Sequence, residues 1–226
     1  MQEFFGIDVG GTAVKWAVLG EDFSIRERGS LPTGFTTAEE TVSALIGLVE
    51  PYRERVNAVG VSAPGGIYEG DVTGTIHRGG ALTFMDGCPL GKLMREALGV
   101  PVAVNNDGKC CALGEYAAGA LRGTRFGVVL AIGTGIGGGV IVDGRLLTGA
   151  HGVGGELGHI EISAPDKAPC TCGKRGCVEQ YASANGIVRV TKKRLAESAE
   201  PSCLRAMEHF ACKDVFDAAR SGDAFA

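Results

Sequence analysis

The chain lacks an excess of basic residues, a leader segment and any apolar run of membrane length. Its 22 lysines and arginines are outnumbered by 26 aspartates and glutamates, which argues against a protein that binds nucleic acid mainly by charge. The start, MQEFFGIDVGG, has no basic stretch and is not a signal peptide. The longest uncharged run, 126–142, has 17 residues, six of them glycine, and is too short for a membrane span. We therefore expect a soluble, cytoplasmic protein with no nucleic-acid or membrane partner.

Cysteine is also scarce, since eight in 226 residues is well below the content of a disulfide scaffold. The cysteines cluster at 110–111 and at 170–177, which indicates reduced thiols or a metal site in a cytosolic protein. Glycine, in contrast, is abundant: 37 residues is more than twice the usual share of about 7%. The glycines occur in bursts between apolar segments, which excludes collagen and low-complexity coil.

Segments with strand and helix character alternate along the first half. Short apolar runs predict strands at 4–9, 13–19, 56–61 and 102–105, the first two joined as a hairpin by Gly10-Gly11. Apolar spacing and end signals predict helices between Thr37 and Pro51, between Pro89 and Gly99, and between Asp107 and Gly119. Strands separated by helices indicate an α/β fold.

A second half begins near Leu121, so we expect domains at 1–119 and 120–226. It opens with strands at 126–132 and 139–142 and continues with a Gly- and Cys-rich stretch at 149–177. From Gly186 onward we expect helix, with one apolar stripe made by Leu204, Met207, Ala211 and Val215. Ser221-Gly222-Asp223 resembles a helix stop followed by a new N-cap, which predicts that the chain is cut short.

Two glycine loops have the character of phosphate sites. They are Asp8-Val9-Gly10-Gly11-Thr12 and the run from Gly133 to Gly139. Glycine permits positive φ and close approach of a ligand, and successive N–H groups form an anion nest. Asp8 can hold Mg²⁺ through water, and Thr12 can donate to a phosphate. The second loop also matches G-x-G-x-x-G, but a strand follows it rather than the helix of a Rossmann loop. A pair of tight hairpin turns is the alternative.

Asn106-Asp107 follows the strand at 102–105, where open α/β sheets place their ligands. A carboxylate there can accept the proton of a substrate hydroxyl as it attacks a γ-phosphate. The alternative is that Asp107 is a plain helix N-cap.

The most specific pattern is Cys170-x-Cys172-x4-Cys177 with His159 upstream. Three thiolates and one imidazole satisfy tetrahedral Zn²⁺, and a filled shell implies a structural metal. Free reduced cysteines are the alternative. Glu156 and Glu179 flank this segment, and carboxylates and an imidazole on one loop suit a ligand with several hydroxyls, such as a sugar. Ordinary surface charge is the alternative for these groups, and it is plausible for Glu179 alone.

Taken together, these motifs resemble the ROK family of sugar kinases and sugar-responsive repressors, which has the two-domain actin/hexokinase-like (ribonuclease H-like) α/β fold. The resemblance extends over essentially the whole chain. It rests on DVGGT at 8–12, SAPGG at 62–66, NND at 105–107, GTGIGGG at 133–139, ELGH at 156–159 and CTCGKRGCVE at 170–179.

The resemblance implies ATP, Mg²⁺ and structural Zn²⁺ as cofactors. It assigns the ATP phosphates and Mg²⁺ to Asp8, Gly10, Gly11, Thr12, Gly133, Thr134, Gly135, Gly137 and Gly138. It assigns the sugar to Gly66, Asn106, Asp107, Glu156, His159 and Glu179, and zinc to His159, Cys170, Cys172 and Cys177. His159 thereby serves both metal and sugar through its two nitrogens. Asp107 is the implied base in transfer of a phosphoryl group, most often to the 6-hydroxyl of a hexose. Family members also lead us to expect a homodimer and a further C-terminal segment that this chain lacks.

One segment departs from the family pattern. His77 to Leu82 differs from the Pro-Asn-Leu type of many glucose-specific members, so glucose, fructose, mannose and N-acetylhexosamines stay open. A repressor-like sensor without a DNA-binding domain, or a non-catalytic zinc-containing sugar-binding fragment, is the alternative to a kinase.

Overall fold

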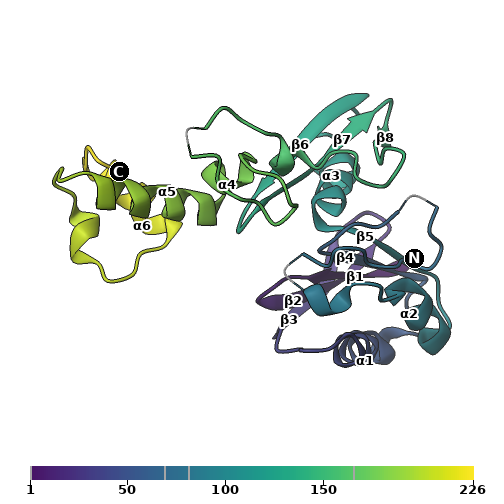
Figure 1. Ribbon diagram of the computed structural model, residues 1–226. Helices are drawn as coiled ribbons and strands as arrows, with labels where there is room; N and C mark the ends of the chain where they lie inside the picture. Colours follow the sequence, from purple (N-terminus) through teal and green to yellow (C-terminus); the bar gives the residue numbers. More distant parts are fainter. Residues whose placement is uncertain (1, 69, 81, 165) are drawn as a thin grey trace. The chain divides into compact units, whose positions relative to one another are not determined.

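The structure is a computed structural model that describes residues 2–68, 70–80, 82–164 and 166–226 (Figure 1). The chain divides into two compact units. Unit 1 comprises Met1–Val129 and Gly139–Gly155, and unit 2 comprises Leu130–Gly138 and Glu156–Ala226. Each unit is described by itself below. The domain boundary expected between residues 119 and 120 stays a prediction.

Unit 1 is built on a five-stranded sheet with the order β3-β2-β1-β4-β5. The strands are β1 (Glu3–Val9), β2 (Ala13–Gly20), β3 (Ile25–Pro32), β4 (Ala58–Ala63) and β5 (Val102–Asn106). β1 runs antiparallel to β2 and parallel to β4, and β4 runs parallel to β5. The carboxyl ends of β1, β4 and β5 therefore lie at the same edge of the sheet.

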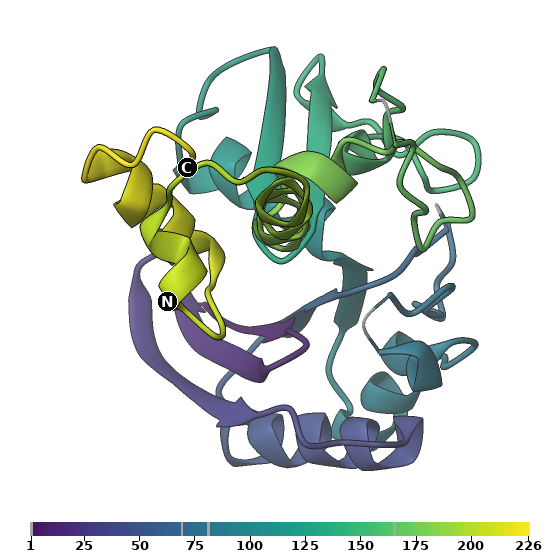
Figure 2. The same ribbon diagram turned by 60° about the vertical axis from the view of Figure 1, so that its left-hand side comes forward.

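Two helices cover one face of this sheet, α1 (Ala38–Val49) and α2 (Leu90–Leu98), and Figure 2 shows α1 running along that face. Alternate residues of β1, such as Phe5 and Ile7, are buried against Leu45 and Met94 of the two helices. α1 begins where the Thr37 side chain accepts a hydrogen bond from the Glu40 N–H, as the capping box predicts. The third helix, α3 (Asp107–Ala118), lies on the opposite face (Figure 1). Single 3-10 turns occupy Glu50–Tyr52 and Thr83–Met85.

A three-stranded sheet in the order β6-β7-β8 follows, made of β6 (Phe126–Ile132), β7 (Ile136–Val142) and β8 (Arg145–Leu146). Unit 2 continues with a 3-10 turn at Leu157–His159, then α4 (Glu179–Ala182), α5 (Ala184–Glu197), a second 3-10 turn at Cys203–Ala206 and α6 (Cys212–Arg220). Its buried apolar cluster is small and centres on Leu204, Val215 and Ala218. None of the helices in the described part of the chain has the length and apolar character needed to cross a bilayer.

The predicted continuous helix after Gly186, with one apolar stripe, is wrong. α5 ends at Glu197, Leu204 lies in a separate 3-10 turn, and Met207 and Ala211 lie outside helices. The stretch 198–202 contains Pro201, which cannot donate a helical hydrogen bond, and Ser202 caps the next turn by accepting from the Leu204 N–H. Local end signals therefore override the apolar spacing.

Candidate active site

Three polar residues form a row across the carboxyl ends of the parallel strands of unit 1. The strand register pairs Asp8 of β1 with Ser62 of β4, and Ser62 with Asn105 of β5. Because paired residues on neighbouring strands project from the same face, their side chains share one side of the sheet. The Ser62 hydroxyl donates to the Asp8 carboxylate at 2.8 Å. In the sequence, Ser62 stands out only as part of the SAPGG motif at 62–66, because a single serine at the end of an apolar strand is a weak signal.

The cap of α3 is Asn106 and not Asp107. Asn106 has an extended backbone, and its side-chain oxygen accepts from the Lys109 N–H at 3.2 Å. Asp107 is the first helical residue, and its carboxylate accepts from the Gly108 N–H at 2.8 Å. The alternative reading of Asp107 as a plain N-cap is therefore wrong, because the preceding residue makes that hydrogen bond. The Asp107 side chain is exposed, so its carboxylate is accessible to a ligand.

The surroundings of Asp107 favour its protonated form. Desolvation raises the pKa of the Asp107 carboxyl, the negative charge of Asp8 raises it further, and the hydrogen bond from the Gly108 N–H opposes both effects. A pKa moved upward from the usual value brings an aspartate closer to the range in which a general base works best.

The loop that carries Gly66 is attached to the same helix start. The Asn106 amide donates to the Gly65 carbonyl at 2.9 Å, and Gly65 has a φ of 98° that a side chain would strain. Gly66 pairs with His77 through two backbone hydrogen bonds of 2.7 and 2.9 Å.

Residues 71–80 form a loop that holds itself together. The Asp71 carboxylate accepts from the backbone N–H groups of Thr73 and Thr75, and Thr75 also bridges to Pro89. This loop contains most of the segment that departs from the family pattern. Ala81 of that segment lies outside the described residues.

A hollow of about 900 Å³ lies on the α3 side of the sheet. Its lining combines small residues such as Gly6, Gly60 and Ala103 with larger ones such as Trp16, and it includes Asp8, Ser62 and Asn105. Cys110 of α3 also lines it, and desolvation and then the negative charges of Asp107 and Asp8 raise the pKa of this thiol to about 11. The Cys110 thiol is therefore protonated at neutral pH and unreactive as a nucleophile.

The glycines of the first loop serve close packing rather than positive φ. Neither Gly10 nor Gly11, both among the described residues, has a positive φ. A Cβ on Gly10 would lie 2.9 Å from the Ala13 carbonyl oxygen, which accepts from the Gly10 N–H. The predicted tight turn between two strands is confirmed.

The second loop shows the same pattern within unit 2. Gly133 and Gly135, which the structure describes, also lack positive φ, and the Gly133 N–H donates to the Gly135 carbonyl at 2.9 Å. The Ile136 N–H donates to the Glu179 carboxylate at 3.0 Å. A Cβ on Gly135 would overlap this carboxylate, whereas one on Gly133 would meet nothing. Gly133 therefore leaves open space for a ligand, and Gly135 makes room for Glu179.

The four predicted zinc ligands converge in unit 2. One ligand atom from each of His159, Cys170, Cys172 and Cys177 lies within 4.8 Å of all the others. Cys170 Sγ lies 3.5 Å from His159 Nδ1, and Cys172 Sγ lies 3.6 Å from Cys177 Sγ. Tetrahedral zinc, with bonds of about 2.3 Å to sulfur and about 2.0–2.1 Å to nitrogen, spaces its ligands about 3.5–3.8 Å apart. The residues therefore fit the metal.

The cluster is electrostatically suited to a cation. Burial, and then the hydrogen bonds and charges of the neighbouring thiols, raise the pKa of the Cys177 thiol to about 12. A divalent cation among these sulfurs would offset the repulsion and favour the thiolate forms. The separation of Cys172 and Cys177 is far longer than a disulfide bond of about 2.05 Å. With Nδ1 turned to the sulfurs, Nε2 of His159 is left for another partner.

The residues predicted to bind sugar fall into two sets. Gly66, Asn106 and Asp107 belong to unit 1, where the Asn106 amide donates to the carbonyl of Gly65, the residue before Gly66. Glu156, His159 and Glu179 belong to unit 2, where the Glu156 carbonyl accepts from the His159 N–H at 3.2 Å. Asn106 and Glu179 make structural hydrogen bonds that the sequence did not predict.

Known proteins match this chain over nearly its whole length. The profile of the ROK family matches residues 4–226. The chain is 36% identical to a glucokinase of Halalkalibacterium halodurans, over 99% of this chain and 70% of that protein. It is 39% identical to an N-acetylmannosamine kinase of Citrobacter koseri, over 84% of this chain and 64% of that protein.

A solved structure shows the same relationship in three dimensions. The crystal structure of a ROK family glucokinase from Streptomyces griseus in complex with glucose and AMPPNP is 33% identical, with a TM-score of 0.78. The alignment covers 99% of this chain and 72% of that one. Among curated relatives the covered share falls to 59%, so the chain spans only part of these proteins.

Proposed function

Because the chain belongs to the ROK family, we propose that it is a sugar kinase that transfers the γ-phosphate of ATP to a hexose hydroxyl. The family resemblance and the actin/hexokinase-like α/β fold predicted from the sequence are both confirmed. The observation that carries the proposal is that the two neighbouring residues at the start of α3 have different roles. Asn106 caps the helix, which leaves the neighbouring Asp107 carboxylate available for chemistry.

In the proposed reaction Asp107 accepts the proton of the attacking sugar hydroxyl. The upward shift of its pKa suits this role, because a stronger base takes the proton more readily. The Asn106 side chain fixes the position of the helix start and of the Gly65–Gly66 loop by its two hydrogen bonds. The base is thus attached to rigid elements, which favours a reproducible approach of the hydroxyl.

The phosphates belong to the two glycine loops in this proposal. Asp8, oriented by the Ser62 hydroxyl, offers carboxylate oxygens to Mg²⁺, directly or through water. When bound, Mg²⁺ neutralises charge on the phosphates. Backbone N–H groups and the Thr12 and Thr134 hydroxyls donate to phosphate oxygens. The residues assigned to this role are Gly10, Gly11, Thr12, Gly133, Thr134, Gly135, Gly137 and Gly138.

We assign a structural zinc to His159, Cys170, Cys172 and Cys177, whose spacing fits it. Glu156, His159 Nε2 and Glu179 are proposed to bind sugar hydroxyls, as are Gly66 and Asn106. The names of the relatives, glucokinase and N-acetylmannosamine kinase, indicate a hexose-type sugar as the acceptor. We therefore propose the 6-hydroxyl of glucose or a related hexose, in a cytoplasmic homodimer. A non-catalytic sugar-binding role is the alternative that the activity test decides.

The test is ADP release from Mg·ATP across hexoses and N-acetylhexosamines, with Asp107→Asn alongside. Sugar-dependent release is expected in the unsubstituted chain and a loss of at least about a hundredfold in the variant, in line with general-base catalysis. Asp143→Asn is the matched control, because Asp143 is an exposed aspartate paired with Arg125 away from the site. Sugar binding without turnover in the unsubstituted chain would favour the non-catalytic alternative, and full turnover by Asp107→Asn would exclude Asp107 as the base.

A further inference from the structure

The second glycine loop is held at three points by the segment that carries the metal ligands. All of these contacts lie within unit 2. Gly158 packs so closely on the Ile136 carbonyl that a Cβ would overlap it. The Glu179 carboxylate accepts from the Ile136 N–H at 3.0 Å. The Ala184 N–H donates to the Gly133 carbonyl at 2.9 Å.

These contacts bracket the metal ligands along the chain. Gly158 directly precedes His159, the first ligand, and Glu179 follows Cys177, the last ligand, by two residues. A metal bound to both His159 and Cys177 therefore fixes both ends of the segment that contacts the loop. Backbone hydrogen bonds from the Val178 N–H to the Ile160 carbonyl at 2.9 Å and from the Ile162 N–H to the Gly176 carbonyl at 2.8 Å also join these ends, and a metal would add side-chain bonds to them.

One carboxylate contacts both the loop and the ligand set. Oε2 of Glu179 accepts from the Ile136 N–H, while Oε1 lies 3.8 Å from Cys170 Sγ. The absence of a side chain at Gly135 gives this carboxylate its room. The Cys170 thiol is the donor in its contact with Oε1, and a metal that binds Cys170 as the thiolate replaces this contact. The position of Glu179 is therefore sensitive to metal.

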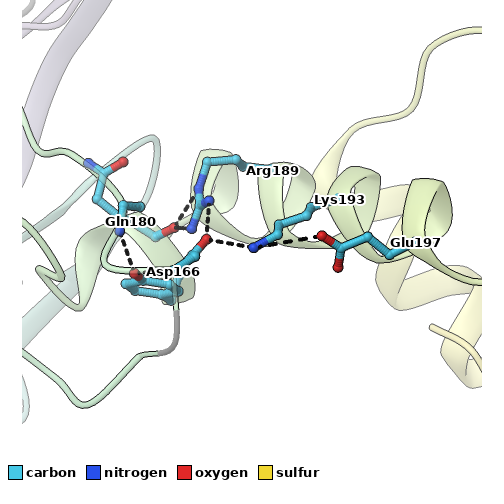
Figure 3. A network of polar contacts seen from close by, with 7 residues as sticks. Asp166, Gln180, Arg189, Lys193 and Glu197 are labelled. Carbon is cyan, nitrogen blue, oxygen red and sulfur yellow. Dashed lines mark hydrogen bonds and ion pairs between the residues drawn. The ribbon is translucent and has the colours of Figure 1, made fainter.

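The far end of the segment is anchored on α5. Ser183 is buried and caps α5 by accepting from the Gly186 N–H at 3.0 Å. Figure 3 shows Asp166 between Arg189 and Lys193 of α5, with N–O distances of 3.0 and 3.4 Å. Asp166 also accepts from the Tyr181 hydroxyl at 2.7 Å, and Tyr181 lies two residues beyond Glu179. The helix thus provides a fixed support for the contacts to the loop.

We propose that residues 158–184 form a metal-dependent clasp on the loop 133–138, with Glu179 as the positioning residue that joins them. Metal in the cysteine cluster orders the loop, so metal and nucleotide bind cooperatively. The identity of the second ligand rests on the proposed function, whereas the ordering of the loop by metal does not. Since coupling between two sites is reciprocal, nucleotide must tighten the binding of metal by the same factor.

The first experiment measures the affinity of Mg·ADP by calorimetry for the zinc-loaded and the chelator-treated chain. We expect about tenfold tighter binding with zinc, within the usual range for coupled sites. Glu179→Ala should reduce this ratio to near one, whereas Glu179→Gln, which keeps an acceptor for the Ile136 N–H, should retain most of it. Glu208→Ala, at an exposed site on unit 2, is the matched control. Equal affinity with and without zinc in the unsubstituted chain would contradict cooperative binding.

The second experiment does not depend on nucleotide or on turnover. Hydrogen exchange of the amides at 133–138 is measured with and without zinc, and the amides of β1 and β4 in unit 1 report whether the rest of the chain stays folded. We expect at least about tenfold faster exchange of the loop on zinc removal and in Glu179→Ala, with unchanged exchange in unit 1. Unchanged exchange of the loop would overturn the clasp. A protected loop in a chain that binds no nucleotide would instead refute the proposed function and leave the clasp standing.

Discussion

At the scale of single residues, the chemistry of unit 1 depends on which of two neighbours caps α3. Asn106 accepts the hydrogen bond from the Lys109 N–H, while the Asp107 carboxylate accepts from the Gly108 N–H and also interacts with the Asn106 side chain. A desolvated carboxylate close to a second negative charge, here that of Asp8, is unfavourable for folding, and such groups are common where catalysis requires them. Asp107 is therefore expected to lower stability at neutral pH while it serves the reaction.

Asp107→Asn is predicted to raise the melting temperature at pH 7. Since folding raises the pKa of this carboxyl, the ionised form weakens the fold, and its cost appears as the pH rises above the unfolded value of about 3.9. The amide removes the charge and keeps an acceptor for the Gly108 N–H. Thermal unfolding at pH 7 and pH 3 checks this: the gain should be present at pH 7 and vanish at pH 3. A loss of stability at pH 7 would show that the charged carboxylate is favourable.

At the scale of elements, a single carboxylate connects a loop to two helices in unit 2. Asp166 accepts hydrogen bonds from Tyr181 of α4 and Arg189 of α5, and Lys193 lies close by. The hydrogen bonds from the Tyr181 hydroxyl and then from Arg189 hold the pKa of this carboxyl well below its usual range. Here the charged form stabilises the fold, which is the opposite of the situation at Asp107.

Asp166→Asn is predicted to destabilise unit 2 at neutral pH. Because folding lowers the pKa of Asp166, its stabilising effect is complete above the unfolded value of about 3.9 and declines as the pH falls toward the folded value. The difference in melting temperature between variant and unsubstituted chain should thus be full at pH 7 and smaller at pH 3. Glu208→Gln, at an exposed site of unit 2, provides a control without this network. A difference that is independent of pH would rule out the charge as its origin.

The sequence could predict the features that local signals determine. The cap of α1 at Thr37, the αL stop of α2 at Gly99 and the convergence of His159 with three cysteines all follow from short spacings. β3 was missed because its eight residues, IRERGSLP, are largely polar, and only its pairing with β2 makes it a strand. The alignment of Asp8, Ser62 and Asn105 likewise comes from the pairing of distant strands, which no local pattern specifies.

At the scale of the whole molecule, the two units differ in what holds them together. The large apolar cluster, from Phe5 to Val102, lies entirely in unit 1, whereas unit 2 has a small one around Leu204 and Val215. A small core needs another source of stability, and a structural metal is one of the usual sources. Unit 2 is accordingly expected to depend on metal much more than unit 1.

The only tryptophan makes this dependence measurable. Trp16 stacks on Phe5 at a centroid distance of 5.4 Å inside unit 1, so its fluorescence reports that unit alone. We predict that a chelator will lower the melting temperature seen by circular dichroism by several degrees, about 5 °C or more, and leave the tryptophan transition nearly unchanged. Cys172→Ser should mimic the chelator, and Cys212→Ser, at the start of α6, should not. Equal shifts in both signals would mean that the metal stabilises the whole chain.

The loop at 71–80 is attached to the rest of unit 1 by the bridges of Gly66 with His77 and of Thr75 with Pro89 and by further backbone hydrogen bonds, such as that from the Lys92 N–H to the Thr73 carbonyl at 2.8 Å, while the Asp71 carboxylate organises its interior. No strand of the central sheet ends in it. The loop therefore combines fixed positions with free ones: Ile76 is buried in the core and Gly74 packs on Val104 of β5, so sequence change in this loop is confined to its exposed positions.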